Sequence, residues 1–340
     1  MRASMNSSNA LWHKPFGHVY IEKRVKDHPV TRRILDKLKQ VNVIDIDNYA
    51  QIFNRNRQDF TLQKQAPSLI LAEKTQDFYY NGSPFCEDFG AKRFYYTSSM
   101  MNCLYDCAYC FLKSLYACGH LVIFVNNNAF IQAVERDLLT GPALYLAISY
   151  ESDLLALNPL THFVEDWLVL AHHHPEMTLE IKTKSPAFSF TSPPPNAVFA
   201  WSLLPEEVIK RYEPRTPSLA ARLRAIQKAL DAHATVRLSL EPLLPIENSP
   251  TVYRRFAHML ADTLPLEAVK DINIGGFRIS RRQFKTFMKK DPYSPVLAYP
   301  LIDKKDSVGY ADEETLTQTL CDAFAPYVAP EKLVCYGPQS

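Results

Sequence analysis

Cys103-Leu-Tyr-Asp-Cys107-Ala-Tyr-Cys110 is the stretch of this 340-residue chain that decides its fold. Three cysteines in the pattern C-x3-C-x2-C can each bind one iron of a 4Fe-4S cluster and leave the fourth iron without a protein ligand. A cluster closed by four thiolates mostly transfers electrons, whereas an iron with open positions can bind a small molecule. We therefore expect Cys103, Cys107 and Cys110 to hold a cluster that performs chemistry.

The residue before the third cysteine, Tyr109, extends the pattern. The triplet with an aromatic residue at this position resembles the radical SAM superfamily. This resemblance implies that the open iron binds S-adenosyl-L-methionine (SAM), which yields a 5′-deoxyadenosyl radical on reduction. Two other interpretations stay open, namely three buried thiols and a zinc site, although zinc sites favour paired C-x2-C or mixed Cys and His ligands.

Apolar segments alternate with amphipathic ones after the cysteine loop, and this order is typical of an α/β fold with a parallel sheet. The resemblance implies a partial (β/α)6 TIM-type barrel, in which the cluster loop follows the first strand and the chemistry lies at the C-terminal ends of the strands. The predicted strands cover residues 93–98, 143–149, 179–183, 198–203, 235–240 and 269–274, and the predicted helices cover 129–139, 161–173, 218–232, 252–263 and 280–289.

Composition fits one large unit, because 47% apolar and 22% charged residues supply ample material for a core. We expect an N-terminal lobe at 1–90, the barrel at 91–290 and a C-terminal extension at 291–340 that contacts DNA. The polar first ten residues and the absence of a long uncharged apolar window predict a cytoplasmic protein without signal peptide or membrane span. No disulfide is expected among the 7 cysteines, because a reducing compartment keeps thiolates free for iron.

Further segments resemble the spore photoproduct lyase family, and the chain is identified as a divergent member. They are Val-Tyr-Ile-Glu at 19–22, Ser-Tyr-Glu-Ser-Asp at 149–153, Leu-Thr-His at 160–162 and Tyr-Glu-Pro-Arg-Thr-Pro-Ser at 212–218. The resemblance implies a DNA-repair lyase that reverts a methylene-bridged thymine dimer to two thymines. Its partners are DNA and an electron donor such as flavodoxin or ferredoxin. The alternatives are a radical SAM enzyme of the same branch with another substrate, and a non-catalytic iron–sulfur redox or binding protein.

A radical suits this reaction, because the bridged thymines offer no acidic proton and no leaving group to acid–base or nucleophilic catalysis. In the family, removal of the C6 hydrogen breaks the bridging bond, and the methylene radical that remains must receive a hydrogen atom. Tyr150 stands where family members usually carry the donor cysteine, and Phe111 replaces their relay tyrosine. We predict Cys86 as the donor and Tyr150 as its alternative, and we count Tyr109 among the catalytic residues. The other cysteines outside the triplet, Cys118, Cys321 and Cys335, are interpreted as small buried hydrophobic residues.

Polar residues at the ends of the predicted strands are candidates for SAM binding. A serine or aspartate at a strand end is also a common turn or cap residue, so the assignment depends on their shared position at one face of the barrel. Glu241, a lone acid before Pro242, is interpreted as structural. The predicted SAM-binding residues are Ser149, Ser152, Asp153, Lys184 and Ser202.

Positive charge gathers between residues 278 and 290, where no acid interrupts it. The net charge of +2 is too small to indicate nucleic-acid binding, but this local cluster predicts phosphate contacts, with a solvated face as the alternative. A second basic segment, residues 23–39, contains acids and is interpreted as an ordinary solvated face. The region 294–310 lacks the Gly-rich hairpin sequence of the family. The predicted DNA contacts are Arg278, Arg281, Arg282 and Lys285.

Overall fold

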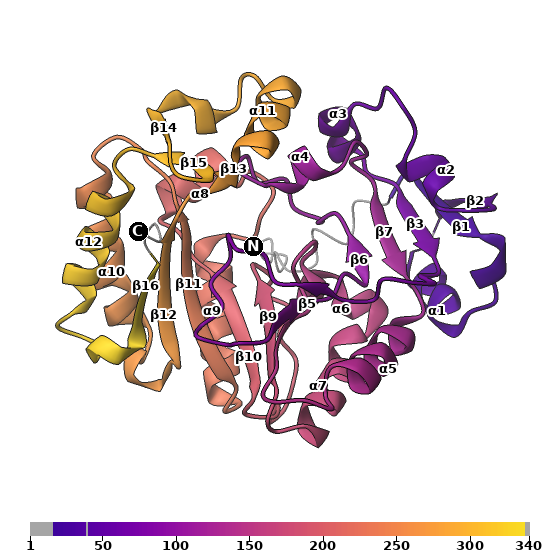
Figure 1. Cartoon of the computed structure of the whole chain (residues 1–340), viewed down its shortest axis with the longest axis horizontal. Helices are drawn as coiled ribbons and strands as arrows, with labels where there is room; N and C mark the ends of the chain where they lie inside the picture. The colour runs from indigo at the N-terminus through magenta and orange to yellow at the C-terminus, as the bar shows by residue number, and fades with distance from the viewer. Residues whose placement is uncertain (1–15, 39, 337–340) are drawn as a thin grey trace, which may run out of the picture.

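An eight-stranded sheet forms the centre of the molecule in the computed structural model, which describes residues 16–38 and 40–336 (Figure 1). The strand order is β16-β12-β11-β10-β9-β8-β5-β4, and every pair from β5 to β16 is parallel. All six predicted strands are present with small shifts at their ends. The strands are β4 (Tyr80–Asn81), β5 (Phe94–Tyr96), β8 (Tyr145–Ala147), β9 (Thr178–Thr183), β10 (Ala197–Ser202), β11 (Thr235–Leu243), β12 (Asp271–Gly276) and β16 (Leu333–Tyr336).

Helices follow most of these strands, and the five predicted helices are confirmed. Ser218 and Ser280 accept hydrogen bonds at the N-termini of α9 and α11, as N-cap residues do. The predicted helix at 161–173 begins later, because His162 adopts a left-handed conformation with a φ of 57° that separates α6 from α7. The helices are α5 (Asn127–Asp137), α6 (Leu154–Thr161), α7 (Phe163–His173), α8 (Glu206–Tyr212), α9 (Leu219–Asp231), α10 (Ser249–Thr263), α11 (Arg281–Lys290) and α12 (Glu313–Phe324).

A second sheet of five strands lies at the right of Figure 1, in the order β2-β1-β3-β7-β6. Its first three strands belong to the predicted N-terminal lobe, whereas β6 and β7 come from beyond residue 90 and flank the cysteine loop. The cluster loop therefore lies between the two sheets. The strands are β1 (His18–Glu22), β2 (Asn42–Ile46), β3 (Leu69–Ala72), β6 (Met100–Met101) and β7 (Leu121–Phe124), with helices α1 (Pro29–Lys37), α2 (Ala50–Phe53), α3 (Phe60–Gln65) and α4 (Leu112–Leu115).

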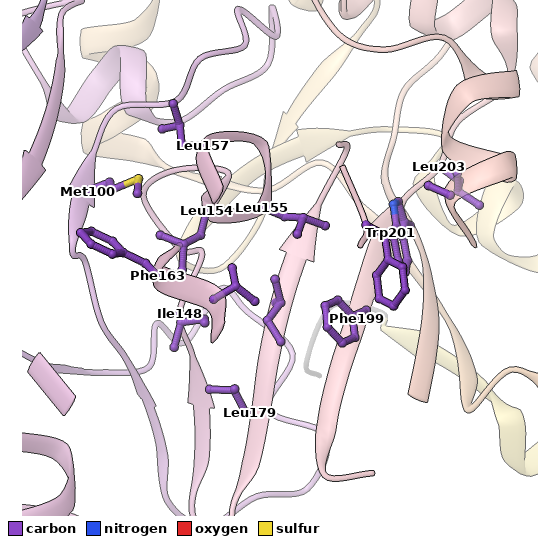
Figure 2. Packing of buried hydrophobic residues seen from close by; sticks show 14 of the residues in the cluster. Met100, Ile148, Leu154, Leu155, Leu157, Phe163, Leu179, Phe199, Trp201 and Leu203 are labelled. Atoms are coloured by element: carbon purple, nitrogen blue, oxygen red, sulfur yellow. The ribbon is translucent and has the colours of Figure 1, made fainter. Parts of the chain in front are cut away.

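One continuous apolar core joins both sheets. Figure 2 shows part of it, with Met100 of β6 in the same cluster as Leu179 of β9 and Trp201 of β10. Every residue of β10 is buried, as expected for a parallel strand covered on both faces. In the part of the chain that the structure describes, no helix is long and apolar enough to cross a membrane.

The C-terminal region contributes to the central sheet, since β16 pairs with β12 and α12 packs on α10. A small antiparallel sheet of β13 (Ile279–Ser280), β14 (Leu301–Asp303) and β15 (Ser307–Tyr310) precedes it. Cys321 and Cys335 form a disulfide, so the prediction of no disulfide and of two buried thiols is wrong. The reason is topological, because the unpredicted strand β16 brings Cys335 beside α12.

Three parts of the predicted domains fall outside the described residues: positions 1–15 of the lobe, Lys39, and the last four residues of the extension. The division into domains at residues 90 and 290 stays a prediction.

Candidate active site

The C-terminal ends of the parallel strands surround a cavity of about 300 Å³. Consecutive strands β8 to β12 each supply lining residues just at or beyond their ends, because parallel strands present their carboxyl ends on one side of the sheet. Every predicted catalytic, SAM-binding and cluster residue lines this cavity, and so does Arg278. The lining includes Cys86, Cys103, Cys107, Tyr109, Cys110, Phe111, Ser149, Tyr150, Ser152, Asp153, Lys182, Lys184, Ser202, Glu241 and Arg278.

The cysteine loop is held from two sides. From α3, the buried Lys64 ammonium donates hydrogen bonds to the carbonyl oxygens of Cys103 and of Tyr105, the latter at 2.9 Å. From the central sheet side, the carbonyl of Tyr212 accepts a 2.7 Å hydrogen bond from the amide of Ala108. The lobe and the central sheet thus fix the loop together.

Glu213 is the buried anion behind the cysteine loop. Its carboxylate accepts hydrogen bonds from the Tyr109 hydroxyl and from the Arg222 guanidinium, and Lys184 Nζ lies 3.8 Å from Oε1. Burial by itself would raise the pKa of Glu213, but the cations Lys184 and Arg222 outweigh it, and the pKa is lowered. The Tyr109 hydroxyl is therefore engaged in holding the loop, and its catalytic role stays a prediction.

The three cysteines of the triplet gather around Tyr105 and Ala156. Burial raises the pKa of Cys103 to about 11 and raises that of Cys107 further, so these thiols need a cation to become thiolates. Within residues 16–38 and 40–336, no three His, Cys, Asp or Glu side chains converge on one metal ion. In a cubane each thiolate binds a different iron, and Cys103, Cys107 and Cys110 all line the cavity, so these residues fit a 4Fe-4S cluster that faces it.

Four of the predicted SAM-binding residues present polar groups to the cavity. The hydroxyl of Ser149 is buried, and the described residues offer it no hydrogen-bond partner, so a ligand would satisfy it. Ser202 is also buried and also lines the cavity, and the Lys184 ammonium lies 5.7 Å from the centre of the Tyr109 ring. The Ser152 hydroxyl has a long contact of 4.0 Å with the sulfur of Met100. These residues fit a ligand with polar groups, and their contacts with SAM stay predictions.

Asp153, in contrast, is fully engaged within the protein. Oδ1 accepts hydrogen bonds from Ala156 N at 2.9 Å and from Thr183 Oγ1 at 2.7 Å, and Oδ2 accepts one from Lys184 N at 2.7 Å. It caps α6 and ties the end of β8 to the end of β9. The geometry supports an indirect role, in which Asp153 positions Ser152 and Lys184.

The predicted donor and its alternative contact each other. The Cys86 thiol donates a 3.5 Å hydrogen bond to the Tyr150 hydroxyl. The ring of Tyr150 stacks on Tyr96 with centroids 4.2 Å apart and lies 5.5 Å from Phe111. Burial raises the pKa of Cys86, which keeps the thiol protonated and able to donate a hydrogen atom. Cys118 is completely buried in the core and does not line the cavity, which confirms its interpretation as a small hydrophobic residue.

An aromatic clamp positions the segment that carries Cys86. Phe89 has a φ of 52°, a left-handed conformation that bulky residues rarely adopt. Its ring stacks on Tyr145 at 5.6 Å, and the Arg237 guanidinium lies 3.2 Å from the ring centre. Arg237 is itself fixed by Asp271, with Nη2 to Oδ2 at 2.9 Å. These contacts hold the strained conformation in place.

Sequence reasoning missed Lys64, Phe89 and Lys182. A signal existed for Lys182, because Glu180, Lys182 and Lys184 alternate with Leu179, Ile181 and Thr183 along β9, and this alternation places the charged residues on the cavity face. Lys64 and Phe89 gave no local signal, since their partners are distant in sequence.

The two basic segments differ in their ion pairs. Arg281 on α11 bonds to Asp303 at 3.0 Å, whereas Arg282 and Lys285 are exposed and make no ion pair within the described residues. In the earlier segment three exposed cations are paired with acids: Lys23 with Asp47, Lys26 with Asp45 and Arg32 with Asp27. Its interpretation as a solvated face is confirmed for the residues that the structure describes.

Comparison with known proteins decides the family. The model of the spore photoproduct lyase family matches residues 15–294. The chain belongs to the spore photoproduct lyase family. Membership makes it a radical SAM lyase of DNA repair, with a 4Fe-4S cluster and SAM as cofactors, and a non-catalytic cluster protein or another substrate is not favoured.

Individual relatives are distant in sequence and close in fold. Spore photoproduct lyase of Bacillus subtilis (strain 168) is 21% identical over 275 residues, which are 75% of each protein. A cysteine-to-alanine mutant of spore photoproduct lyase superposes with a TM-score of 0.78 at 16% identity, covering 94% of this chain and 98% of the other. A double mutant with bound AdoMet and dinucleoside spore photoproduct has a TM-score of 0.76 at 17% identity, with the same coverage.

Proposed function

We propose that this lyase reverts the spore photoproduct to two thymines, and that Cys86 donates the hydrogen atom that completes the reaction. The observation that carries this proposal is the presence of the Cys86 thiol in the same cavity as the three cysteines of the cluster motif. We also infer that the run of parallel strands from β5 to β12 is the partial (β/α)6 barrel of radical SAM enzymes, since successive strands are neighbours in the sheet.

The cofactors supply one reactive species, a 5′-deoxyadenosyl radical that removes the C6 hydrogen atom of the lesion. The protein must then control the fate of the substrate radical. Cleavage of the bridging bond releases one thymine and leaves a methylene radical on the other. The Cys86 S–H bond breaks, its hydrogen atom forms the methyl group, and a sulfur radical remains on Cys86.

Tyr150 is placed to restore Cys86. Its hydroxyl lies 3.5 Å from the sulfur and can rotate to give a hydrogen atom to the sulfur radical. The Tyr150 radical then recovers a hydrogen atom from the 5′-methyl group that took the C6 hydrogen, so the cycle consumes no hydrogen. This pair replaces the family arrangement, in which a cysteine occupies position 150 and a tyrosine occupies position 111.

The surface around α11 is the proposed contact for the DNA backbone, with Arg282 and Lys285 as its exposed cations and Arg278 and Arg281 as further contacts. Flipping the lesion out of the duplex would bring it to the cavity. The electron that reduces the cluster is proposed to come from a small redox protein such as flavodoxin or ferredoxin.

The test is an anaerobic reaction of the reconstituted, reduced enzyme with SAM and dinucleoside spore photoproduct. We expect the unlinked thymine dinucleoside to accumulate while most of the SAM is regenerated, because 5′-deoxyadenosine returns its hydrogen atom in each cycle. Cys107→Ala should abolish both SAM cleavage and the thymine product, because the loss of one thiolate disrupts the cluster. SAM cleavage that leaves the photoproduct intact in the wild-type enzyme would contradict the proposal.

A further inference from the structure

A charged pair lies in the cavity near Cys86 and has no part in the hydrogen-transfer steps. Lys182 of β9 and Glu241 of β11 form an ion pair through Nζ and Oε1. Both residues line the same cavity as the Cys86 thiol.

The pair remains open to the cavity. The Lys182 side chain is 38% exposed and that of Glu241 is 19% exposed, and both residues line the cavity wall. A carboxylate can accept about four hydrogen bonds and an ammonium can donate three, so each group keeps capacity beyond the pair. A ligand in the cavity can therefore bind to both without breaking their contact.

The surrounding fold is shaped for the carboxylate. A Cβ atom added at Gly275 of β12 would lie 3.1 Å from Glu241 Oε2, so this glycine leaves the space that the carboxylate occupies. An ion pair in a partly dry cavity is rarely a net gain in stability over apolar residues. Such a pair in the cavity that holds the reacting thiol indicates recognition of a ligand.

We infer that Glu241 and Lys182 bind the imide edge of the thymine that receives hydrogen from Cys86. The Glu241 carboxylate accepts the N3–H hydrogen bond, and the Lys182 ammonium donates to an adjacent carbonyl oxygen. This inference rests on the proposed function, because it requires a thymine ring in the cavity. A cytosine ring, which has no N3–H and carries an amino donor beside N3, presents the wrong pattern to the pair.

The test compares dinucleoside spore photoproduct with its N3-methylated analogue, using the reconstituted enzyme without reductant, so that binding is measured without turnover. We expect wild-type enzyme to bind the methylated analogue at least tenfold more weakly, since methylation removes the donor that Glu241 accepts. Glu241→Met and Lys182→Met should each weaken binding of the parent compound by a similar factor, and Glu241→Met should no longer distinguish the two compounds, because methionine has no oxygen to accept the N3–H hydrogen bond. Glu207→Gln, which alters an exposed ion pair with Arg255 on the outer surface, is the matched control.

Equal binding of the two compounds by the wild-type enzyme would overturn the inference, whether or not the variants fold. Failure of the proposed function looks different, because the wild-type enzyme would then cleave SAM and leave the photoproduct intact. If the parent and the methylated compound are cleaved with the same KM, the proposed function stands and the imide contact is wrong.

Discussion

Phe89 is the residue whose backbone shows most clearly that the cavity is built around Cys86. Its left-handed conformation is maintained by Tyr145 on one side and Arg237 on the other. Strain of this kind persists only where the surroundings impose it, and it commonly marks a functional site. The clamp fixes a loop that would otherwise let the thiol move away from the substrate radical.

Replacing Phe89 by alanine should therefore reduce the fraction of substrate radicals that receive their hydrogen atom from Cys86. We expect SAM cleavage to continue while adducts with solvent or buffer species increase relative to the thymine product. Loss of the half-buried ring should also lower the free energy of unfolding by about 1–2 kcal/mol. Phe190→Ala, which removes a half-buried ring packed on Phe199 away from the cavity, is the control. A product distribution that is the same in both variants would show that the clamp has no part in positioning Cys86.

Glu213 is a second residue on which the site depends. Its negative charge compensates the positive charges of Arg222 and Lys184, and its carboxylate accepts a hydrogen bond from the Tyr109 hydroxyl. Glu213→Gln should lower the free energy of unfolding by about 3–5 kcal/mol, because it leaves buried cations without their counter-charge. The comparison is with Glu207→Gln in chemical denaturation, and iron content after reconstitution should fall only in Glu213→Gln. An unfolding curve unchanged from wild type would contradict this view of the network.

The cysteine triplet, Tyr150 and Cys86 were singled out from the sequence, and they line one cavity, while their roles stay predictions. The triplet and Tyr150 were singled out by a motif or a departure from one, and Cys86 by its place just before the first strand. Lys64 contacts the cysteine loop from α3, a helix beside the five-stranded sheet. The conformation of Phe89 depends on a contact with Arg237, which is distant in sequence. Contacts of this kind form only when distant parts of the chain meet in the fold, so no local sequence pattern predicts them.

At the scale of helices and strands, α11 is the proposed contact surface for DNA. Phe287 is buried beneath the helix, and exposed cations remain on its outer face. Substitution of Arg282, Lys285 and Lys289 together by alanine should weaken binding of duplex DNA of any sequence. It should also reduce the slope of the logarithm of the binding constant against the logarithm of the salt concentration by about 3, since each phosphate contact contributes about 0.9.

The matched control for α11 is the alanine triple variant of Lys23, Lys26 and Arg32, whose charges are already paired with acids. We expect it to bind DNA almost as the wild type does. Fluorescence anisotropy over a range of salt concentrations measures both variants. An equal loss of affinity in the two would mean that binding follows net charge and not the surface of α11.

The same scale shows why some elements were predicted and others were not. The long helices and the parallel strands of the central sheet have clear apolar patterns, so their positions were predicted to within a few residues. Strand β6 has only two residues, and β16 has only four, Leu-Val-Cys-Tyr, so neither offers a long pattern. Pairing with β7 and with β12 forms these strands, and that pairing also produced the unexpected disulfide between Cys321 and Cys335.

For the whole molecule, the two sheets act as one support for the cysteine loop. The five-stranded sheet flanks the loop with β6 and β7, and its α3 helix supplies Lys64. Helix α8, which follows β10 of the eight-stranded sheet, ends at Glu213, and the strands of that sheet border the cavity that Cys86 lines. A common core joins the two, so the cluster and the donor thiol are held in one frame.

The source of the hydrogen atom in the product tests this account most directly. A thiol proton exchanges with solvent, so in D₂O the donor at Cys86 carries deuterium. Mass spectrometry of the reaction with SAM and dinucleoside spore photoproduct should show one deuterium in the new methyl group for wild-type enzyme. Cys86→Ala should cleave SAM but give adducts in place of that product, while Cys118→Ala behaves as wild type. Clean deuterated product formed by Cys86→Ala at the wild-type rate would contradict the account.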